Sequence, residues 1–208
     1  MPNRSIKFLA LGDSYTSGTG VAMAKSWPRQ TARVLRSRGF PIQTPRIIAH
    51  HGWTTGDLLQ ALEGQELPSN WDLVSLLIGV NDHYQGDRPA LYRSRFMELL
   101  DWSISLAVNG PGRVLILSIP DWSVTPFAAD RDRDQLRSEL ERFNQINREL
   151  AQEAGAHYLD ITPLSRRASL KPGGLVEDGL HPSGQQYRHW TDKIAAALQK
   201  HLADHPER

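Results

Sequence analysis

The chain has no cysteine among its 208 residues. This absence excludes disulfide bonds, catalysis by a thiolate, and metal sites built from thiolate ligands. The sequence also lacks an excess of charge of either sign, because 24 Lys and Arg residues stand against 23 Asp and Glu residues, a formal net charge of +1 at pH 7. With so little positive surplus to attract phosphate groups, nucleic acid is not an expected partner.

Long hydrophobic runs are also missing. The N-terminal segment carries an apolar run from Phe8 to Leu11 only, whereas the core of a signal peptide needs roughly 7 to 15 such residues. The apolar share of 39% and the charged share of 23% are those of an ordinary globular protein. We therefore expect a cytoplasmic protein without a membrane span. The length, and the absence of a linker-like segment, predict one domain over residues 1–208.

Strand and helix signals alternate along the chain. Short apolar runs predict five buried strands, at residues 6–11, 46–49, 73–78, 114–119 and 157–161. Helical spacing predicts helices at residues 27–38, 55–62, 89–108, 134–153 and 184–202. This alternation indicates an α/β fold: a three-layer α/β/α sandwich around a parallel five-stranded sheet of flavodoxin-like strand order.

Polar residues follow the predicted strands. Ser14 comes directly after the first strand, Gly52 after the second and Asn81 after the third, while Asp178 and His181 lie in a C-terminal loop. Ligands of an open parallel sheet bind beyond the carboxyl ends of its strands. We therefore expect these segments to converge on one edge of the sheet.

These residue types supply the parts that acyl transfer needs. Ser14 is the candidate nucleophile, His181 the base that accepts its proton, and Asp178 the carboxylate that orients the imidazole. The backbone N–H groups of Ser14 and Gly52 and the side-chain amide of Asn81 are candidate donors for an oxyanion hole. Each segment alone fits an ordinary turn or helix cap, and it is their joint occurrence that favours catalysis.

Other residues near the strand ends have structural explanations of equal or greater weight. Asp57 and Asp82 are predicted to cap the helices that follow them. Adjacent histidines rarely bind one metal ion and the nearby carboxylates lack ligand spacing, so we expect neither a metal nor a cofactor. Aromatic residues after strand ends suit either the wall of a substrate pocket or core packing, and four are candidates for substrate binding: Trp53, Tyr84, Trp122 and Phe127.

The motifs resemble those of the GDSL, or SGNH, hydrolase superfamily over nearly the whole chain. Ser14 in Gly-Asp-Ser matches the family nucleophile, Gly52 and Asn81 match its oxyanion donors, and Asp178 and His181 match its Asp-x-x-His pair. The chain departs from the family pattern in Gly-Asp-Ser-Tyr where Gly-Asp-Ser-Leu is usual, and in the bulky His-His pair before Gly52, which leaves Gly56 as an alternative.

The resemblance implies a three-layer fold, no metal, and activity as an esterase, thioesterase, lysophospholipase or carbohydrate deacetylase. Residues 79–86 and 118–127 are similar to bacterial lysophospholipase-like members. We expect a serine esterase that cleaves small-molecule or lipid-like esters through an acyl-enzyme. If an alcohol instead of water attacks the acyl-enzyme, the same site acts as an acyltransferase. An α/β-hydrolase would need Gly-x-Ser-x-Gly, which does not occur here. A non-catalytic flavodoxin-like binding module is the alternative of another class.

Overall fold

The computed structural model describes residues 5–169 and 171–204. Its centre is one parallel sheet in the order β2-β1-β3-β4-β5, which is the flavodoxin-like order. The strands are β1 (Phe8–Gly12), β2 (Arg46–Ala49), β3 (Leu73–Leu77), β4 (Val114–Leu117) and β5 (His157–Leu159). The predicted fold class is confirmed, and each predicted strand is observed within two residues of its expected ends.

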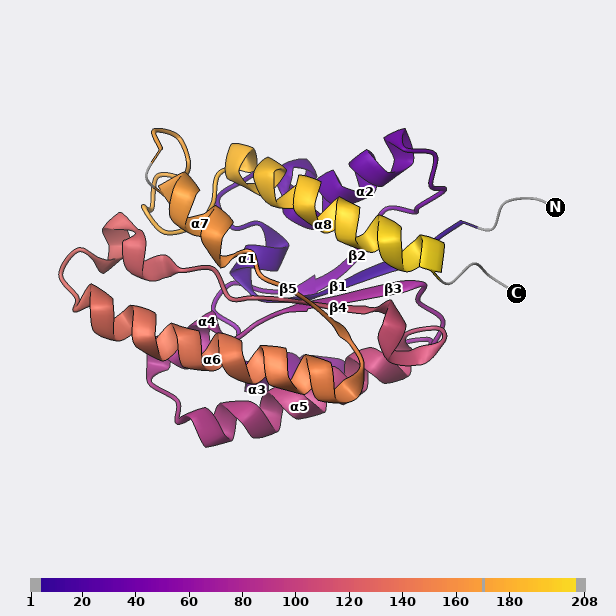
Figure 1. Ribbon diagram of the computed structural model, residues 1–208, viewed down its shortest axis with the longest axis horizontal. Helices are drawn as coiled ribbons and strands as arrows, with labels where there is room; N and C mark the ends of the chain where they lie inside the picture. The colour runs from indigo at the N-terminus through magenta and orange to yellow at the C-terminus, as the bar shows by residue number, and fades with distance from the viewer. Residues whose placement is uncertain (1–4, 170, 205–208) are drawn as a thin grey trace.

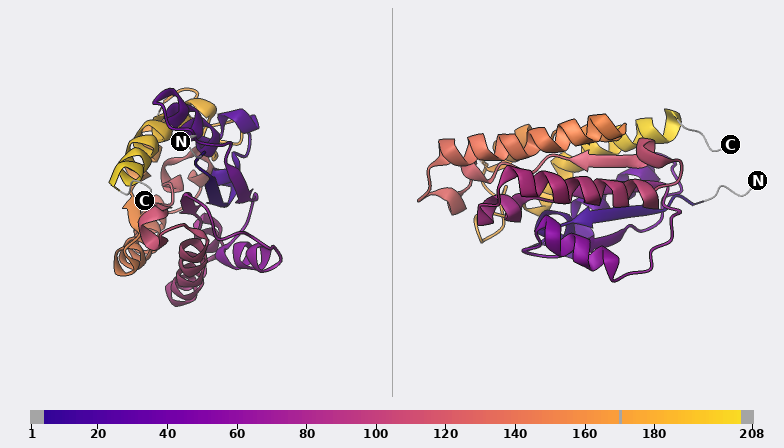
Figure 2. Two further views of the ribbon diagram at one scale, coloured as in Figure 1. Left: turned by 90° about the vertical axis from the view of Figure 1, so that its right-hand side faces the viewer. Right: turned by 90° about the horizontal axis from the view of Figure 1, so that it is seen from below.

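Helices cover both faces of this sheet (Figures 1 and 2). On one face lie α2 (Trp27–Ser37) and α8 (Gly184–Asp204), which pack against each other. On the other lie α3 (Thr55–Glu63), α5 (Pro89–Leu106) and α6 (Arg133–Ala154). All five of these helices match their predicted ranges to within two residues at each end.

Several short elements were not predicted. They are the helices α1 (Ser14–Ser17), α4 (Val80–Gln85) and α7 (Thr162–Ser169), and the 3-10 turns η1 (Met23–Lys25), η2 (Gly110–Arg113), η3 (Trp122–Val124) and η4 (Pro126–Ala128). Elements this short do not complete the apolar repeat that identifies a helix in a sequence. Four of them carry candidate site residues: α1 and α4, and the turns η3 and η4, which contain Trp122 and Phe127.

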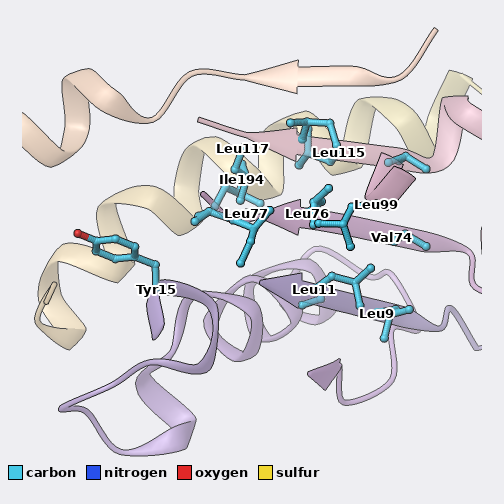
Figure 3. Close-up of a cluster of buried hydrophobic side chains, with 14 of the residues drawn as sticks. Leu9, Leu11, Tyr15, Val74, Leu76, Leu77, Leu99, Leu115, Leu117 and Ile194 are labelled. Carbon is cyan, nitrogen blue, oxygen red and sulfur yellow. The ribbon is translucent and has the colours of Figure 1, made fainter. Parts of the chain in front are cut away.

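The core lies between the sheet and the two helix layers. Every residue of β1 and β3 is buried, because a parallel sheet covered on both faces has no solvent-exposed side. Figure 3 shows leucines of these strands, such as Leu11 and Leu76, in one buried cluster with Ile194 of α8 and Leu99 of α5. The edge strands β2 and β5 are partly exposed.

The strand register places the candidate residues together. Gly12, the last residue of β1, pairs with Ala49 of β2 and Leu77 of β3. The three strands thus end at the same edge of the sheet, and the segments that begin with Asp13, His50 and Ile78 leave from it side by side.

Candidate active site

Ser14 begins the short helix α1 immediately after β1. Asp13 caps this helix, since its Oδ1 accepts a hydrogen bond from the Tyr15 N–H at 2.9 Å. A side chain at Gly12 would lie 2.2 Å from the carbonyl oxygen of Leu77, so only glycine allows this approach of β1 to β3. The Ser14 N–H belongs to the first turn of a helix, where N–H groups have no intrahelical partner.

The loop after α7 folds back on itself to present the other two residues. Its backbone closes through hydrogen bonds from the Val176 N–H to the His181 carbonyl at 2.9 Å and from the Gly179 N–H to the Val176 carbonyl at 3.1 Å. Gly179 has a φ of +67°, a left-handed conformation that favours glycine. The turn brings Asp178 next to His181.

Asp178, His181 and Ser14 form a continuous hydrogen-bonded chain. The Nδ1 of His181 lies 2.6 Å from Oδ2 of Asp178, and its Nε2 lies 2.9 Å from Oγ of Ser14. Ser14 and His181 are 3% and 4% exposed, respectively. This arrangement allows the imidazole to accept the hydroxyl proton while the carboxylate fixes its tautomer.

The Asp178 carboxylate is held in its charged form. Desolvation raises the pKa of Asp178, but hydrogen bonds from the His181 imidazole and from the N–H groups of His181 and Leu180 outweigh it, so the pKa lies below its ordinary value. Both N–H groups donate to Oδ1 at 2.9 Å. A permanent negative charge here stabilises an imidazolium at position 181.

Asn81 lies in α4, on the other side of the site. One N–H of its amide donates to the Trp53 carbonyl at 2.8 Å, which orients the group and leaves its second N–H for another acceptor. Gly52 lies in the exposed turn after β2 with a φ of +83°. The two residues follow separate strand ends, those of β3 and β2. Asn81 lines the cavity beside Ser14, whereas Gly52 is not part of its wall.

A cavity of about 290 Å³ opens beside the Ser14 hydroxyl. Its wall includes three rings that touch one another, with centroid separations of 5.8 Å between Tyr84 and Trp122 and 6.0 Å from Phe127 to each of them. Asn81 also lines the cavity, whereas Trp53 does not and packs against His50 at 5.6 Å. The volume lies near the lower end of small-molecule sites.

A model of the GDSL-like lipase/acylhydrolase family matches residues 10–189 of the chain. The protein belongs to this family. An arylesterase of Vibrio mimicus is 28% identical over 200 residues, covering 95% of this chain and 90% of the relative. The chain, a GDSL-family member, is therefore an ester-cleaving hydrolase.

Solved structures share the fold of this GDSL-family chain. The crystal structure of TesA aligns with a TM-score of 0.73 at 18% identity, covering 94% of this chain and 99% of the other. The esterase EstA from Pseudoalteromonas sp. aligns with a TM-score of 0.71 at 17% identity, covering 95% and 98%. Both alignments extend over nearly the whole three-layer sandwich.

The GDSL-family site includes residues to which the sequence analysis assigned no role in it. His51 lines the cavity with its ring 5.4 Å from that of His181, and the Tyr15 ring lies 5.7 Å from His181 on another side. Val80 and Leu180 also contribute to the wall. Adjacency to the predicted residues was the available signal, since each of the four neighbours a candidate in the sequence.

The two carboxylates predicted to cap helices differ in outcome. Asp57 caps the start of α3 in a capping box, with its Oδ2 accepting from the Thr54 N–H at 2.8 Å. The prediction for Asp82 is wrong, because this residue lies inside α4 and accepts from the N–H of Thr55 at 2.9 Å and from its hydroxyl. Asp82 thus caps α3, which precedes it in the chain.

Over residues 5–169 and 171–204, no group of three or more His, Asp or Glu side chains is arranged to hold a metal ion. Among the same residues, no helix combines the length and apolar character that spanning a membrane requires.

Proposed function

We propose that this hydrolase cleaves aryl and short-chain esters through an acyl-enzyme on Ser14. The observation that carries the proposal is the chain from Asp178 through His181 to Ser14, which ends at the mouth of a small aromatic cavity.

In the proposed reaction, Ser14 Oγ attacks the acyl carbon while its proton passes to Nε2 of His181. The negative charge on the former carbonyl oxygen is stabilised by the N–H groups of Ser14 and Gly52 and by the free N–H of Asn81. The intermediate collapses as His181 returns the proton to the leaving alcohol, and the bond to that oxygen breaks. Water then repeats the sequence on the acyl-enzyme. Asp178 stays ionised throughout.

Cavity size and lining support the proposed substrate class. A space of about 290 Å³ suits an aromatic ring or a short acyl chain better than a long lipid chain. Tyr84, Trp122 and Phe127 offer ring faces and edges to such a group. Trp53 would act through its carbonyl, which orients Asn81. The printed function of the Vibrio mimicus relative, arylesterase, agrees with this class.

The test is the turnover of phenyl acetate and of p-nitrophenyl esters from acetyl to decanoyl. We expect kcat/KM to be highest from acetyl to butyryl. Ser14→Ala should lower kcat by at least about 10⁴-fold. Ser17→Ala is the matched control, since Ser17 lies one turn further along α1 and donates to the Ser14 carbonyl.

Three results would contradict the proposal. Wild-type turnover in a folded Ser14→Ala variant would rule out an acyl-enzyme on Ser14. A Ser14-dependent rate that peaks at decanoyl would be consistent with the acyl-enzyme but would contradict a small substrate and favour a lipid-like one. A faster rate on a thioester or an acetylated sugar would likewise replace the substrate class.

A further inference from the structure

We infer that His83 is a positioning residue for substrate binding: it holds the Trp122 indole as a fixed wall of the cavity. The inference rests on the proposed function, because it takes the cavity beside Ser14 as the substrate pocket. His83 is absent from the cavity wall and is 6% exposed. It therefore has no direct contact with the space in which we place the substrate, and any effect on substrate passes through its neighbours.

The contact that carries the inference joins two side chains 39 positions apart. The Trp122 Nε1–H donates a hydrogen bond to Nδ1 of His83 at 3.1 Å, with the two rings edge to face at 5.7 Å. Phe143 of α6 packs against His83 in the same manner, with a centroid separation of 5.6 Å. His83 is thus held between the cavity wall and the helix layer.

The chemistry of this pair requires one protonation state. An indole N–H is a donor only, so Nδ1 of His83 must be an unprotonated acceptor and the proton must reside on Nε2. Desolvation lowers the pKa of His83, which opposes the charged form, although Glu139 and Asp121 act in the other direction. The Nε2 atom lies 3.5 Å from Oε2 of Glu139.

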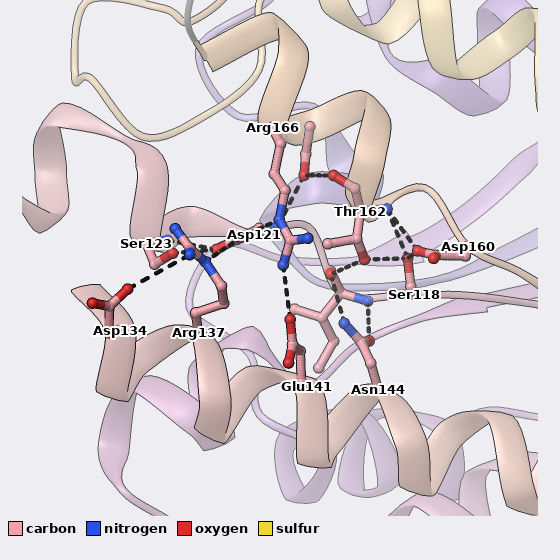
Figure 4. A network of polar contacts seen from close by, with 12 residues as sticks. Ser118, Asp121, Ser123, Asp134, Arg137, Glu141, Asn144, Asp160, Thr162 and Arg166 are labelled. Carbon is pink, nitrogen blue, oxygen red and sulfur yellow. Dashed lines mark hydrogen bonds and ion pairs between the residues drawn. The ribbon is translucent and has the colours of Figure 1, made fainter. Parts of the chain in front are cut away.

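The backbone beneath Trp122 is anchored separately (Figure 4). Asp121 accepts from Nε of Arg166 at 2.6 Å, and its own N–H donates to the Ser165 hydroxyl at 2.9 Å. Arg166 also contacts Glu141 of α6 at 3.1 Å. These contacts fix the main chain of η3. They do not involve the Trp122 ring, whose N–H is bound by His83.

Loss of the acceptor has a defined consequence. Trp122 is 2% exposed, and a buried N–H without a partner is unfavourable. The indole would turn until its N–H met water or another acceptor, and the rings of Tyr84 and Phe127 that pack on it would follow. The cavity would then fit an aromatic substrate poorly, while Ser14 and His181 would keep their geometry.

The experiment is a double-mutant cycle with phenyl acetate as substrate. His83→Phe removes the acceptor and keeps a ring, His83→Asn keeps an acceptor near the Nδ1 position, and Trp122→Phe removes the donor. We expect His83→Phe to raise KM by about 10-fold and to change kcat by less than about 2-fold. His83→Asn should stay within about 3-fold of the wild type.

The double-mutant cycle distinguishes positioning of Trp122 by His83 from a contribution of His83 to the stability of the fold. In the Trp122→Phe background, His83→Phe should add less than about 2-fold to KM, because the contact is already absent. An undiminished effect there would overturn the inference, since His83 would then act through Asn81 or through overall stability. A fall in kcat at constant KM would overturn it as well.

A spectroscopic measurement tests the inference without activity and without a variant of His83. Long-range ¹⁵N–¹H spectra of the wild type at neutral pH should show the Nε2–H tautomer for His83. An Nδ1–H tautomer or an imidazolium would overturn the inference, because neither accepts from Trp122. If this tautomer is found but Ser14→Ala leaves phenyl acetate turnover unchanged, the proposed function fails while the contact between His83 and Trp122 stands.

Discussion

At the scale of single residues, Asp13 is a fully buried carboxyl group that directly precedes the proposed nucleophile. Burial, aided by the nearby charge of Asp82, raises the pKa of Asp13 to about 8, although the Tyr15 N–H hydrogen bond opposes the shift. Its Oδ2 is buried without a hydrogen-bond partner among the described residues. At neutral pH Asp13 is therefore mainly a neutral carboxylic acid that caps α1.

A stability measurement across pH tests this protonation state. The folded protein retains a proton on Asp13 between the unfolded pKa, near 3.8, and about 8, so wild-type stability declines as the pH rises through this window. Asp13→Asn has no such proton. We expect the free energy of unfolding of the variant, relative to the wild type, to increase from pH 4 to pH 8 by on the order of a few kcal/mol. A constant difference, measured by urea unfolding, would contradict the buried neutral acid.

In contrast to Asp13, Asp178 has a lowered pKa and is ionised at neutral pH. For this residue we predict an effect on the catalytic rate. Asp178→Asn should lower kcat by about 10³- to 10⁴-fold with KM nearly unchanged, because the amide no longer fixes the productive tautomer of His181. Steady-state kinetics on phenyl acetate measures both constants. A variant with wild-type kcat would show that the contact of 2.6 Å between Asp178 and His181 has no role in catalysis.

At the scale of elements, the helix ends that form the site are fixed by specific caps. The N-terminus of α3 receives two carboxylates, Asp57 from its own first turn and Asp82 from α4. The N-terminus of α4 depends on Gly79, which has a φ of +119°. Together with the hydrogen bond from Asn81 to the Trp53 carbonyl, these contacts connect the segment after β2 to the helix that carries Asn81.

Asp57→Ala should lower the free energy of unfolding at pH 7 by about 1 kcal/mol, the usual value of such a cap. Hydrogen bonds from the Thr54 side chain and backbone N–H lower the pKa of Asp57. The cost is therefore fully present above the unfolded pKa, declines below it, and is lost as the pH falls through the lowered folded pKa. Asp101→Ala, at an exposed position inside α5, is the control and should cost nothing.

Gly79 and Gly86 flank α4 and form a matched pair, since both have a positive φ. A Cβ at Gly79 would lie 2.5 Å from the Tyr92 hydroxyl, whereas one at Gly86 would meet nothing within 4 Å. Gly86→Ala should cost about 1 kcal/mol for backbone strain alone. Gly79→Ala should cost at least about 1 kcal/mol more and should also lower kcat, because α4 and Asn81 shift. Equal costs in thermal or chemical unfolding would contradict the steric constraint.

At the scale of the whole molecule, burial is greatest in the middle of the sheet. The central strands β1 and β3 are covered by helices on both faces (Figure 2) and are fully buried, whereas residues of the edge strand β2 are partly exposed. The site lies at the carboxyl ends of these strands, so the most deeply buried part of the sheet supports the residues proposed for catalysis.

Truncations in a central and an edge strand should differ accordingly. Leu76→Ala, in β3 and fully buried, should lower the free energy of unfolding by about 2 to 5 kcal/mol. Ile47→Ala, in β2 and half-buried, should cost less than about 2 kcal/mol. Urea denaturation of both variants measures the difference, and a larger cost at position 47 would contradict the assignment of the core.

Much of this arrangement was predictable because its causes are local. The apolar runs and helical stripes indicated the five strands and the five long helices, since each is long enough to show its period. Parallel strands that end together place Ser14, Gly52 and Asn81 at one edge. The three-residue spacing of Asp178 and His181 suits a tight turn, which the structure contains.

Tertiary structure decided the rest, because these features depend on contacts between distant segments. Asp82 caps a helix that begins 27 positions earlier, and Trp122 meets its acceptor His83 39 positions away. The raised pKa of Asp13 comes from burial beneath elements that no local pattern identifies. The sequence by itself determined the fold class and the residues suited to acyl transfer, whereas only the packing of separate elements set the size of the cavity and the ionisation state of the groups around it.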